Sequence, residues 1–241
     1  RRHDLRAPIP RDLPEVLAGQ PILGLRRRAK YLIIETPAAG LLCHLGMTGS
    51  WRVAPPGDER DHDHCYLHLR DGRRLAYRDP RRFGLLDLVR GGHHPALEAL
   101  GPEPLERDFT SAGLLACCRR RRRSAVKAVI MDQAVVVGVG NIYAAEALFH
   151  AGIRPTRPAG RLRPAEATAL VQAIRAVLRA AIRAGGSTIS DFRQAGGGDG
   201  YFQHRFRVYG REGQPCLACA TTLRHRVIAG RASVWCPTCQ V

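Results

Sequence analysis

Apolar and polar residues alternate in short runs along the first ninety or so positions, a pattern typical of half-buried β-strands. Turn-forming segments separate the runs, such as Pro-Pro-Gly-Asp at 55–58 and Asp-Gly at 71–72. The spacing of the runs favours a β-sandwich. We predict strands at 22–25, 31–35, 41–45, 65–69, 74–77 and 83–89.

The apolar period changes to that of helices after a Pro- and Gly-containing connection at 91–108. Thr110 or Ser111 is placed to cap a first helix. A second helix is predicted from Asn141, after Gly-Val-Gly, to near Gly152. A third begins at Pro164 and carries one apolar stripe as far as Gly185: Leu170, Ile174, Val177/Leu178 and Ala181/Ile182.

Four cysteines near the end of the chain have the spacing of a metal site. Cys216 and Cys219, and then Cys236 and Cys239, form two Cys-x-x-Cys pairs separated by sixteen residues. Each pair aims two thiolates at one point, so the four sulfurs can surround one tetrahedral Zn²⁺. The intervening stretch is long enough for a two-stranded ribbon with its turn at Ala229-Gly230. Disulfides are the alternative, which the absent secretory signal disfavours. The other cysteines, at 43, 65, 117 and 118, are expected to be reduced thiols.

The charge indicates a polyanionic partner. The net charge is +17, and the basic residues cluster at 26–30 and in an unbroken arginine run at 119–123. Nucleic acid is the simplest partner for such a surface. A membrane surface would favour a basic amphipathic helix with large apolar residues opposite, and the sequence has none. No apolar run reaches the length of a membrane span, and the first ten residues lack the apolar core of a signal peptide.

Lysine is rare in this chain. Of the 38 basic residues only Lys30 and Lys127 are lysines. An ammonium group can lose its proton or act as a compact point charge, which a guanidinium cannot do. Both lysines are therefore candidates for chemistry, with chance retention as the alternative.

Several longer stretches carry a family resemblance. They are RRRAKYLIIE (26–35), HLGMTGSWRV (44–53), HDH (62–64), YRDPRRFG (77–84), LGPEPL (100–105), MDQAVVVGVGNIYAAEALFHAGIRP (131–155), DGYFQHRFRVYGREGQPC (199–216) and the terminal cysteine pattern. In this combination the chain resembles the formamidopyrimidine-DNA glycosylase family of bacterial 8-oxoguanine repair enzymes. The resemblance implies an α+β multidomain protein: a β-sandwich catalytic domain at 1–92, a helix–two-turn–helix DNA-binding domain at 109–195 and a zinc-ribbon finger at 201–241. The one Zn²⁺ would be structural, because all four positions are filled by protein.

The family's nucleophile is an N-terminal proline followed by glutamate. A terminal amine suits this role because its pKa lies near neutrality. The chain begins at Arg1, and Pro14 is internal, so its nitrogen is an amide. We expect the polypeptide to extend upstream to this Pro-Glu; otherwise the nucleophile and general acid are missing.

The resemblance assigns two further catalytic residues. Lys30 matches the lysine that contacts DNA phosphates and donates the proton in β-elimination. Arg231, on the turn of the ribbon, matches the finger arginine that grips phosphates beside the lesion and acts in δ-elimination. The alternative for Lys30 is a strand-surface charge.

A glycosylase must swing its target nucleotide out of the duplex, and side chains must fill the gap. Met47, Arg81 and Phe83 match the family's filling residues. Phe83 would wedge between base pairs, Met47 would occupy the vacated stack, and Arg81 would bond the unpaired base. The alternative is that Met47 and Phe83 belong to the core of the sandwich.

Other residues match DNA contacts of the family. They are His62, Arg122 and Asn141, with Lys127 in the same stretch as Arg122. His62 and His64 could instead form a metal pair, and Asn141 could be only a helix N-cap. The glycine-rich loop at 196–200 matches the segment that closes over the extruded base.

The resemblance thus implies a base-excision enzyme that removes 8-oxoguanine and formamidopyrimidines from duplex DNA and nicks the strand by β,δ-elimination, and we expect it to be monomeric and cytoplasmic. Two alternatives remain. One is an endonuclease VIII-like glycosylase for oxidised pyrimidines, and the other is a non-catalytic module that binds damaged DNA.

Overall fold

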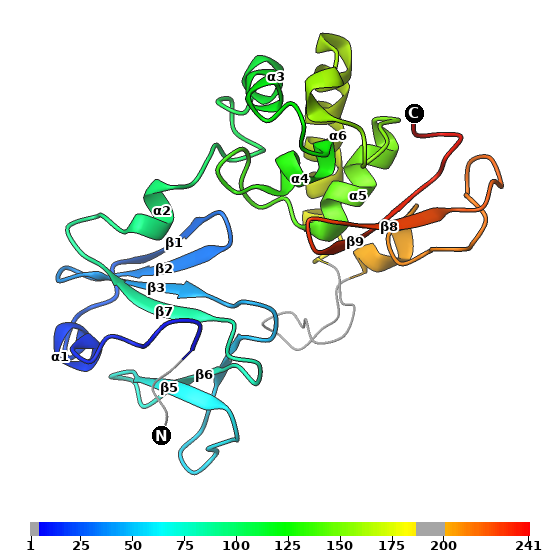
Figure 1. Ribbon diagram of the computed structural model, residues 1–241. Helices are drawn as coiled ribbons and strands as arrows, with labels where there is room; N and C mark the ends of the chain where they lie inside the picture. Colours follow the sequence, from blue (N-terminus) through cyan, green and yellow to red (C-terminus); the bar gives the residue numbers. More distant parts are fainter. Residues whose placement is uncertain (1–4, 187–200) are drawn as a thin grey trace. The chain divides into compact units, whose positions relative to one another are not determined.

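The computed structural model describes residues 5–186 and 201–241. The predicted base-covering loop at 196–200 lies outside these residues. The described chain falls into two compact units, one of residues 5–98 and the other of residues 99–186 together with 201–241. Both are traced in Figure 1, and each is described by itself.

The first unit contains two antiparallel sheets. One has the order β1-β2-β3-β7, and the other has the order β4-β6-β5. Two short helices flank them, α1 (Leu13–Leu17) and α2 (Pro95–Glu98). The strands are β1 (Gly24–Arg28), β2 (Tyr31–Glu35), β3 (Gly40–His44), β4 (Ser50–Val53), β5 (Asp63–His68), β6 (Arg74–Arg78) and β7 (Leu85–Val89).

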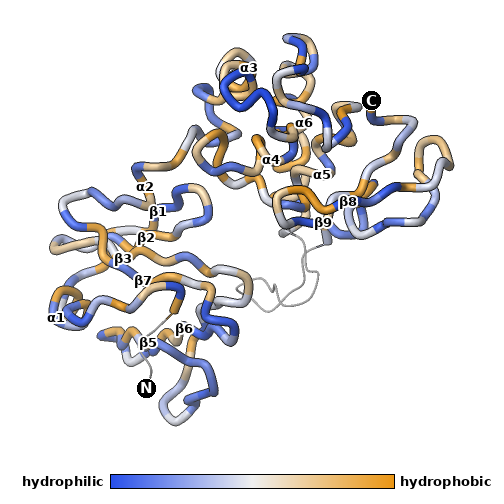
Figure 2. The backbone as a smooth tube through the Cα atoms, viewed as in Figure 1, coloured by the Kyte–Doolittle hydropathy of each residue, from blue (hydrophilic) through white to orange (hydrophobic). Residues whose placement is uncertain are grey.

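The core of this unit lies between the two sheets. Leu41, Cys43 and Leu86 of the first sheet share one buried cluster with Tyr77 of the second. The indole Nε1 of Trp51, on β4, donates a hydrogen bond to Sγ of Cys43 at 3.2 Å, which joins the sheets directly. Figure 2 shows the hydrophobic stretches on β2 and β3. The predicted β-sandwich is confirmed.

Two strand predictions need correction. The predicted strand at 22–25 is displaced, because β1 pairs with β2 from Gly24↔Glu35 to Arg28↔Tyr31. Its arginines remain on an edge strand with mostly exposed side chains. Strand β4 was missed, since its four residues, Ser-Trp-Arg-Val, give too short a pattern and gain order from pairing with β6.

The second unit is built on four helices. They are α3 (Ser111–Arg120), α4 (Val126–Met131), α5 (Asn141–His150) and α6 (Pro164–Arg183), with short 3₁₀ turns η1 (Ala159–Arg161) and η2 (Phe202–Arg205). Thr110 caps α3 as predicted, its side chain accepting a hydrogen bond from Gly113 N. Pro164 begins α6, and Glu166 completes a capping box with the backbone of Arg163.

The apolar stripe of α6 packs into the core of this unit. Leu170, Ile174 and Val177 are buried there, with Ala181 continuing the stripe. Ile182, which the sequence also assigned to the stripe, is 66% exposed. A helix turns 100° per residue, so residue 182 faces away from the stripe once residue 181 lies in it. Among the described residues, no helix combines the length and apolarity needed to cross a bilayer.

A two-stranded ribbon completes the second unit. Strands β8 (Arg224–Ile228) and β9 (Arg231–Trp235) pair antiparallel, with Ala229-Gly230 between them as predicted. The buried carboxylate of Glu146, on α5, accepts hydrogen bonds from the backbone N–H groups of residues 207, 208 and 209 at 2.8–3.0 Å. Gln240 donates from its amide nitrogen to Ile153 O at 2.9 Å. These bonds fix the start of the cysteine-bearing segment to α5 and its end to Ile153, three residues beyond that helix.

Candidate nucleic-acid interface and metal centre

The four cysteine sulfurs lie around one point, all within 4.8 Å of one another. The sulfurs of Cys219 and Cys236 are 3.5 Å apart, and those of Cys216 and Cys239 are 4.0 Å apart. A tetrahedron with Zn–S bonds of about 2.3 Å has edges of about 3.8 Å. The arrangement therefore fits one Zn²⁺ with four protein ligands and no open position for substrate.

Each cysteine pair is supported by its own turn. Ala218 N points to Sγ of Cys216, and Cys239 N to Sγ of Cys236, both at 3.4 Å. Such N–H groups stabilise the thiolates that a zinc ion requires. By contrast, burial raises the pKa of Cys43, Cys65 and Cys118 to about 11, so these thiols stay protonated.

Lys30 lies on the tight turn between β1 and β2. Its neighbour Ala29 is buried and has a φ of +54°, and Lys30 itself is exposed. Surrounding atoms still desolvate the ammonium group and lower its pKa below the usual 10.5. The pKa of His44 is lowered as well, first by burial and then by the positive charges of Lys30 and Arg6. Lys30 is thus a proton-bearing group whose proton is held less tightly than usual.

The three predicted filling residues are all on the surface. Met47 is 64% exposed in the loop after β3, and Phe83 is 47% exposed in the loop before β7. The guanidinium of Arg81 lies over the Phe83 ring, 4.8 Å from its centroid. The alternative that Met47 and Phe83 are core residues is therefore wrong.

A buried aspartate joins the two loops that carry these residues. Asp79 is fully buried, and one carboxylate oxygen accepts from the Thr48 hydroxyl at 2.5 Å while the other accepts from Gly84 N at 2.7 Å. A Cβ added at Gly46 would lie 2.5 Å from the carbonyl carbon of Phe83, and Gly46 has a φ of +63°. Only glycine permits this close approach. The exposed residues therefore stand on a rigid base.

His62 precedes β5 in a turn, with a φ of +71°, and is exposed. It therefore lies just outside the strand. His64 is on β5, and its Nε2 lies 2.9 Å from the carbonyl oxygen of Asp79. Within the described ranges, the terminal cysteines are the sole group of three or more potential metal ligands in reach of one another. A metal site at His62 and His64 would therefore lack a third protein ligand among the described residues.

Lys127 differs most from its predicted role as a DNA contact. It is fully buried, and its Nζ donates to Asn141 Oδ1 at 2.6 Å, to Ser233 Oγ at 2.7 Å and to Ala232 O at 3.1 Å. Burial lowers its pKa to about 8. The ammonium connects α4, the start of α5 and strand β9, so it does not present its charge to solvent.

Asn141 is the first residue of α5, and Gly140 is the N-cap. The alternative that Asn141 is only a cap is wrong, since its side chain accepts from Lys127. Among the described residues, no side chain caps the first turn of α5. The backbone N–H groups of this turn point outward from the start of the helix, and N–H groups in this position favour anions.

The two remaining predicted DNA residues are exposed arginines of the second unit. Arg122 follows α3, and Arg231 is the first residue of β9, one position beyond the turn on which the sequence placed it. Arg231 therefore stands two residues before Ser233, the acceptor of Lys127.

Sequence reasoning missed the residues that hold these groups in place. Asp79, Glu146 and Ser233 are buried polar residues that bond the functional loops, the ribbon and Lys127, respectively. Asp79 and Glu146 are acids within strongly basic or apolar stretches, which is the one signal in the sequence that could have singled them out.

Family comparisons cover nearly the whole chain. Residues 1–86 match the formamidopyrimidine-DNA glycosylase N-terminal domain, and residues 100–193 match the helix–two-turn–helix domain of the same enzymes. Residues 213–241 match a zinc finger found in formamidopyrimidine-DNA glycosylase and isoleucyl-tRNA synthetase.

Curated relatives and solved structures agree with these matches. A formamidopyrimidine-DNA glycosylase of Bdellovibrio bacteriovorus is 55% identical over 99% of this chain and 88% of its own length. One from Stenotrophomonas maltophilia is 52% identical over 100% of this chain and 89% of its own. The MutM (Fpg) protein of Thermus thermophilus superposes with a TM-score of 0.86 at 45% identity, covering 94% of this chain and 85% of its own. The Lactococcus lactis Fpg in complex with abasic-site DNA gives 0.86 at 33% identity, covering 95% and 85%. The chain therefore belongs to the formamidopyrimidine-DNA glycosylase family.

Proposed function

We propose that the protein excises oxidised purines from duplex DNA, as a base-excision glycosylase, and then nicks the strand by β- and δ-elimination. The single observation that carries the proposal is the exposed Met47–Arg81–Phe83 set on two loops that Asp79 binds together. Three large side chains held at the surface, two of them apolar, have no role in the core. They suit a protein that must replace an extruded nucleotide.

The three side chains divide the task by their chemistry. Phe83 offers a flat apolar edge that can enter between base pairs, and its ring already lies against the Arg81 guanidinium. Arg81 carries planar N–H donors that match the acceptors of an unpaired base. Met47 is unbranched and adaptable, so it can fill a vacated stack of variable shape. Because the loops are fixed beforehand, little ordering entropy is lost when DNA binds.

Lys30 is proposed to handle the proton of the elimination step. A general acid works best when its pKa is near the working pH, and desolvation moves the pKa of Lys30 in that direction. Lys30 is an exposed residue of the turn, so a phosphate or a sugar atom can approach it. Arg231 is proposed to grip the phosphates beside the lesion and to assist δ-elimination, for which its exposed guanidinium offers paired donors.

Phosphate binding is proposed for further groups in each unit. In the second unit these are the uncapped first turn of α5 with Asn141, and the exposed Arg122. In the first unit it is His62, on its turn before β5. The Zn²⁺ would hold the ribbon folded so that Arg231 is presented on β9, and it would take no part in the reaction.

The alternatives are less well supported. The curated relatives at 51–55% identity are named for formamidopyrimidine excision, which disfavours an endonuclease VIII-like specificity. The solved complex of the Lactococcus lactis Fpg contains DNA with Fapy-dG, which is also an oxidised purine. We further propose that the protein acts as a monomer in the bacterial cytoplasm, and that the sandwich, helical and ribbon domains extend over 1–92, 109–195 and 201–241.

Borohydride trapping tests the proposal. The protein, expressed from its own complete reading frame, is incubated with a duplex containing 8-oxoguanine and then reduced. A glycosylase with lyase activity forms an imine or iminium with the sugar, so a covalent protein–DNA adduct is expected. Binding of the lesion duplex without any adduct would favour the non-catalytic module instead.

A further inference from the structure

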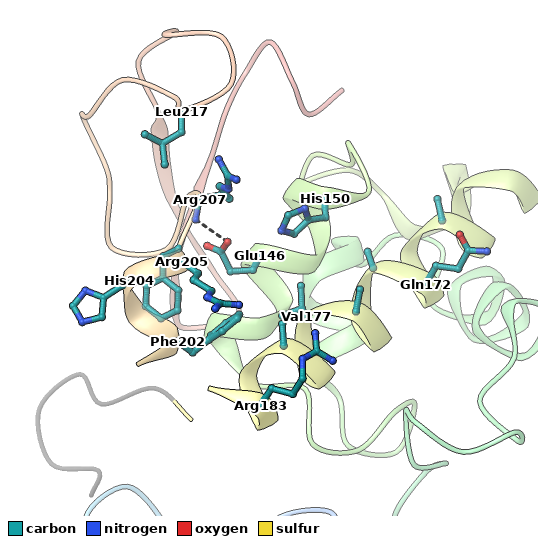
Figure 3. Close-up of a pocket in the computed structure, with 15 residues that line it drawn as sticks. Glu146, His150, Gln172, Val177, Arg183, Phe202, His204, Arg205, Arg207 and Leu217 are labelled. Carbon is teal, nitrogen blue, oxygen red and sulfur yellow. Dashed lines mark hydrogen bonds between the residues drawn. The ribbon is translucent and has the colours of Figure 1, made fainter. Parts of the chain in front are cut away.

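A groove of about 900 Å³ in the second unit lies between α5, α6, η2 and the turn that carries Cys216 and Cys219, and nothing in the proposed function uses it. Its floor is apolar. Ala173 and Val177 of α6 line it together with the buried Phe202, and Leu217 stands at its edge with 59% of its surface exposed. Figure 3 shows Phe202 and Val177 at this floor and Leu217 above them.

The rim of the groove is basic. Arg183, Arg205 and Arg207 line it, and all three are exposed, as are His150 and His204. Within residues 5–186 and 201–241, no acidic side chain forms an ion pair with these arginines. Among the described residues that line the groove, Glu146 alone carries a carboxylate, and it already accepts three backbone hydrogen bonds. The rim arginines therefore present positive charge that no ion pair within the described residues neutralises.

The shape of the floor suits a helix. Alanines at 169, 173, 176 and 180 follow one face of α6 and line the groove. The face from 169 to Arg183 is about 21 Å long, or about four turns, at 1.5 Å per residue. Small residues allow a second helix to approach to about 8 Å between axes.

We propose that this groove binds an amphipathic acidic helix of a partner protein, whose apolar side chains at i, i+3, i+4 and i+7 enter the groove while its carboxylates face the rim arginines. DNA would bring sugars and phosphates against alanine, valine and phenylalanine and leave the recess unfilled. The groove includes the C-terminal end of α5 at His150, about 14 Å along the helix from Asn141, where a phosphate contact is proposed.

The experiment uses a fluorescein-labelled 20-residue peptide with leucines at helical spacing and glutamates elsewhere. Two control peptides carry the leucines distributed around the helix, or lysine in place of glutamate. Fluorescence anisotropy with the full chain should give at least tenfold tighter binding for the first peptide than for either control. Equal binding of the redistributed peptide would overturn the proposal.

Two protein variants locate the binding. Ala176→Trp fills the groove at an exposed position, and the double change Arg205→Glu with Arg207→Glu reverses the rim. Each should weaken peptide binding at least tenfold. Arg119→Glu with Arg179→Glu makes the same charge change at exposed positions outside the groove and should change binding less than twofold. Thermal melts check folding, and the double variant carries the test if Ala176→Trp does not fold.

The last measurement is the affinity of the parent and of Ala176→Trp for undamaged duplex DNA. Ala176→Trp leaves the net charge unaltered, so its affinity for duplex should remain within twofold of the parent. A tenfold loss of duplex affinity, or displacement of the peptide by duplex at stoichiometric concentration, would identify the groove as a DNA surface and overturn the proposal. No arm measures excision, so failure here is distinguishable from failure of the proposed glycosylase function.

Discussion

The ammonium of Lys127 lies 2.6 Å from Oδ1 of Asn141, so a buried charge fixes the first residue of α5. The same ammonium donates to Ser233, two residues after Arg231. Two groups proposed to contact phosphate are therefore held by one side chain that does not reach solvent. We therefore propose that Lys127 affects DNA binding through the residues that it positions.

The salt dependence of duplex binding distinguishes a positioning role of Lys127 from a direct contact with phosphate. Lys127→Met should weaken duplex binding and leave the slope of log K against log salt concentration unchanged, because no ion pair with phosphate is lost. Arg122→Met, at an exposed position, should reduce the slope by about 0.9. If Lys127→Met reduces the slope as much as Arg122→Met does, the ammonium contacts phosphate and the positioning role is wrong.

Asp79 should govern the loops that carry Met47 and Phe83. In Asp79→Asn one acceptor oxygen becomes an N–H donor, which then faces the Thr48 hydroxyl or Gly84 N. A buried donor left unsatisfied costs about 1–3 kcal/mol, so the free energy of unfolding should fall by that amount in urea titrations. Asp71→Asn, an exposed aspartate near Arg73, serves as control with a change within about 0.5 kcal/mol. Equal effects of the two variants would count against Asp79 as the residue that joins the two loops.

Removal of zinc should unfold the ribbon without unfolding the sandwich. The protein should bind one Zn²⁺ per chain by atomic absorption, and Cys236→Ser or chelation should lower that value and expose β9 to proteolysis. Tryptophan fluorescence gives a direct readout, because buried Trp235 is in the ribbon, whereas Trp51 belongs to the sandwich. An unchanged Trp235 signal after complete zinc loss would contradict a structural role for the metal.

The capping carboxylate of α6 predicts an acid-sensitive contribution to stability. A hydrogen bond from Arg163 is the main cause that lowers the pKa of Glu166 from 4.5 to about 2, and Arg157 adds to it. Because the folded state favours the ionised form, the contribution is present above pH 4.5 and is lost as the pH falls toward 2. Arg163 is 76% exposed, so solvent screening limits the effect to about 1–2 kcal/mol.

The measurement is the unfolding free energy of the parent and of Glu166→Gln across this pH range. The difference should be present at pH 7 and disappear near pH 2, while Glu15→Gln, at an exposed position on α1, should show little effect. A difference that is constant with pH would mean that the ionised carboxylate is not the stabilising form.

The fold was largely predictable from sequence because its strongest signals are local. The cysteine spacing gave the zinc ligands, and Thr110 and Pro164 marked two helix starts correctly. Exposure of Met47 and burial of Lys127 were not predictable from residue type, since each reverses the usual preference of its side chain. Asp79 and Glu146 were missed because their partners are backbone N–H groups or distant hydroxyls, which leave no periodic pattern in the chain.

Single-turnover excision tests the central claim most directly. The protein expressed from its complete reading frame is compared on duplexes with 8-oxoguanine, thymine glycol or no lesion, with Phe83→Ala as the matched variant. The account predicts rapid excision of 8-oxoguanine and slower excision of thymine glycol. It also predicts that Phe83→Ala lowers the rate on 8-oxoguanine at least tenfold while binding undamaged duplex as the parent does, with stability within about 0.5 kcal/mol because the ring is exposed. Preference for thymine glycol, or equal loss of binding to both duplexes in Phe83→Ala, would contradict it.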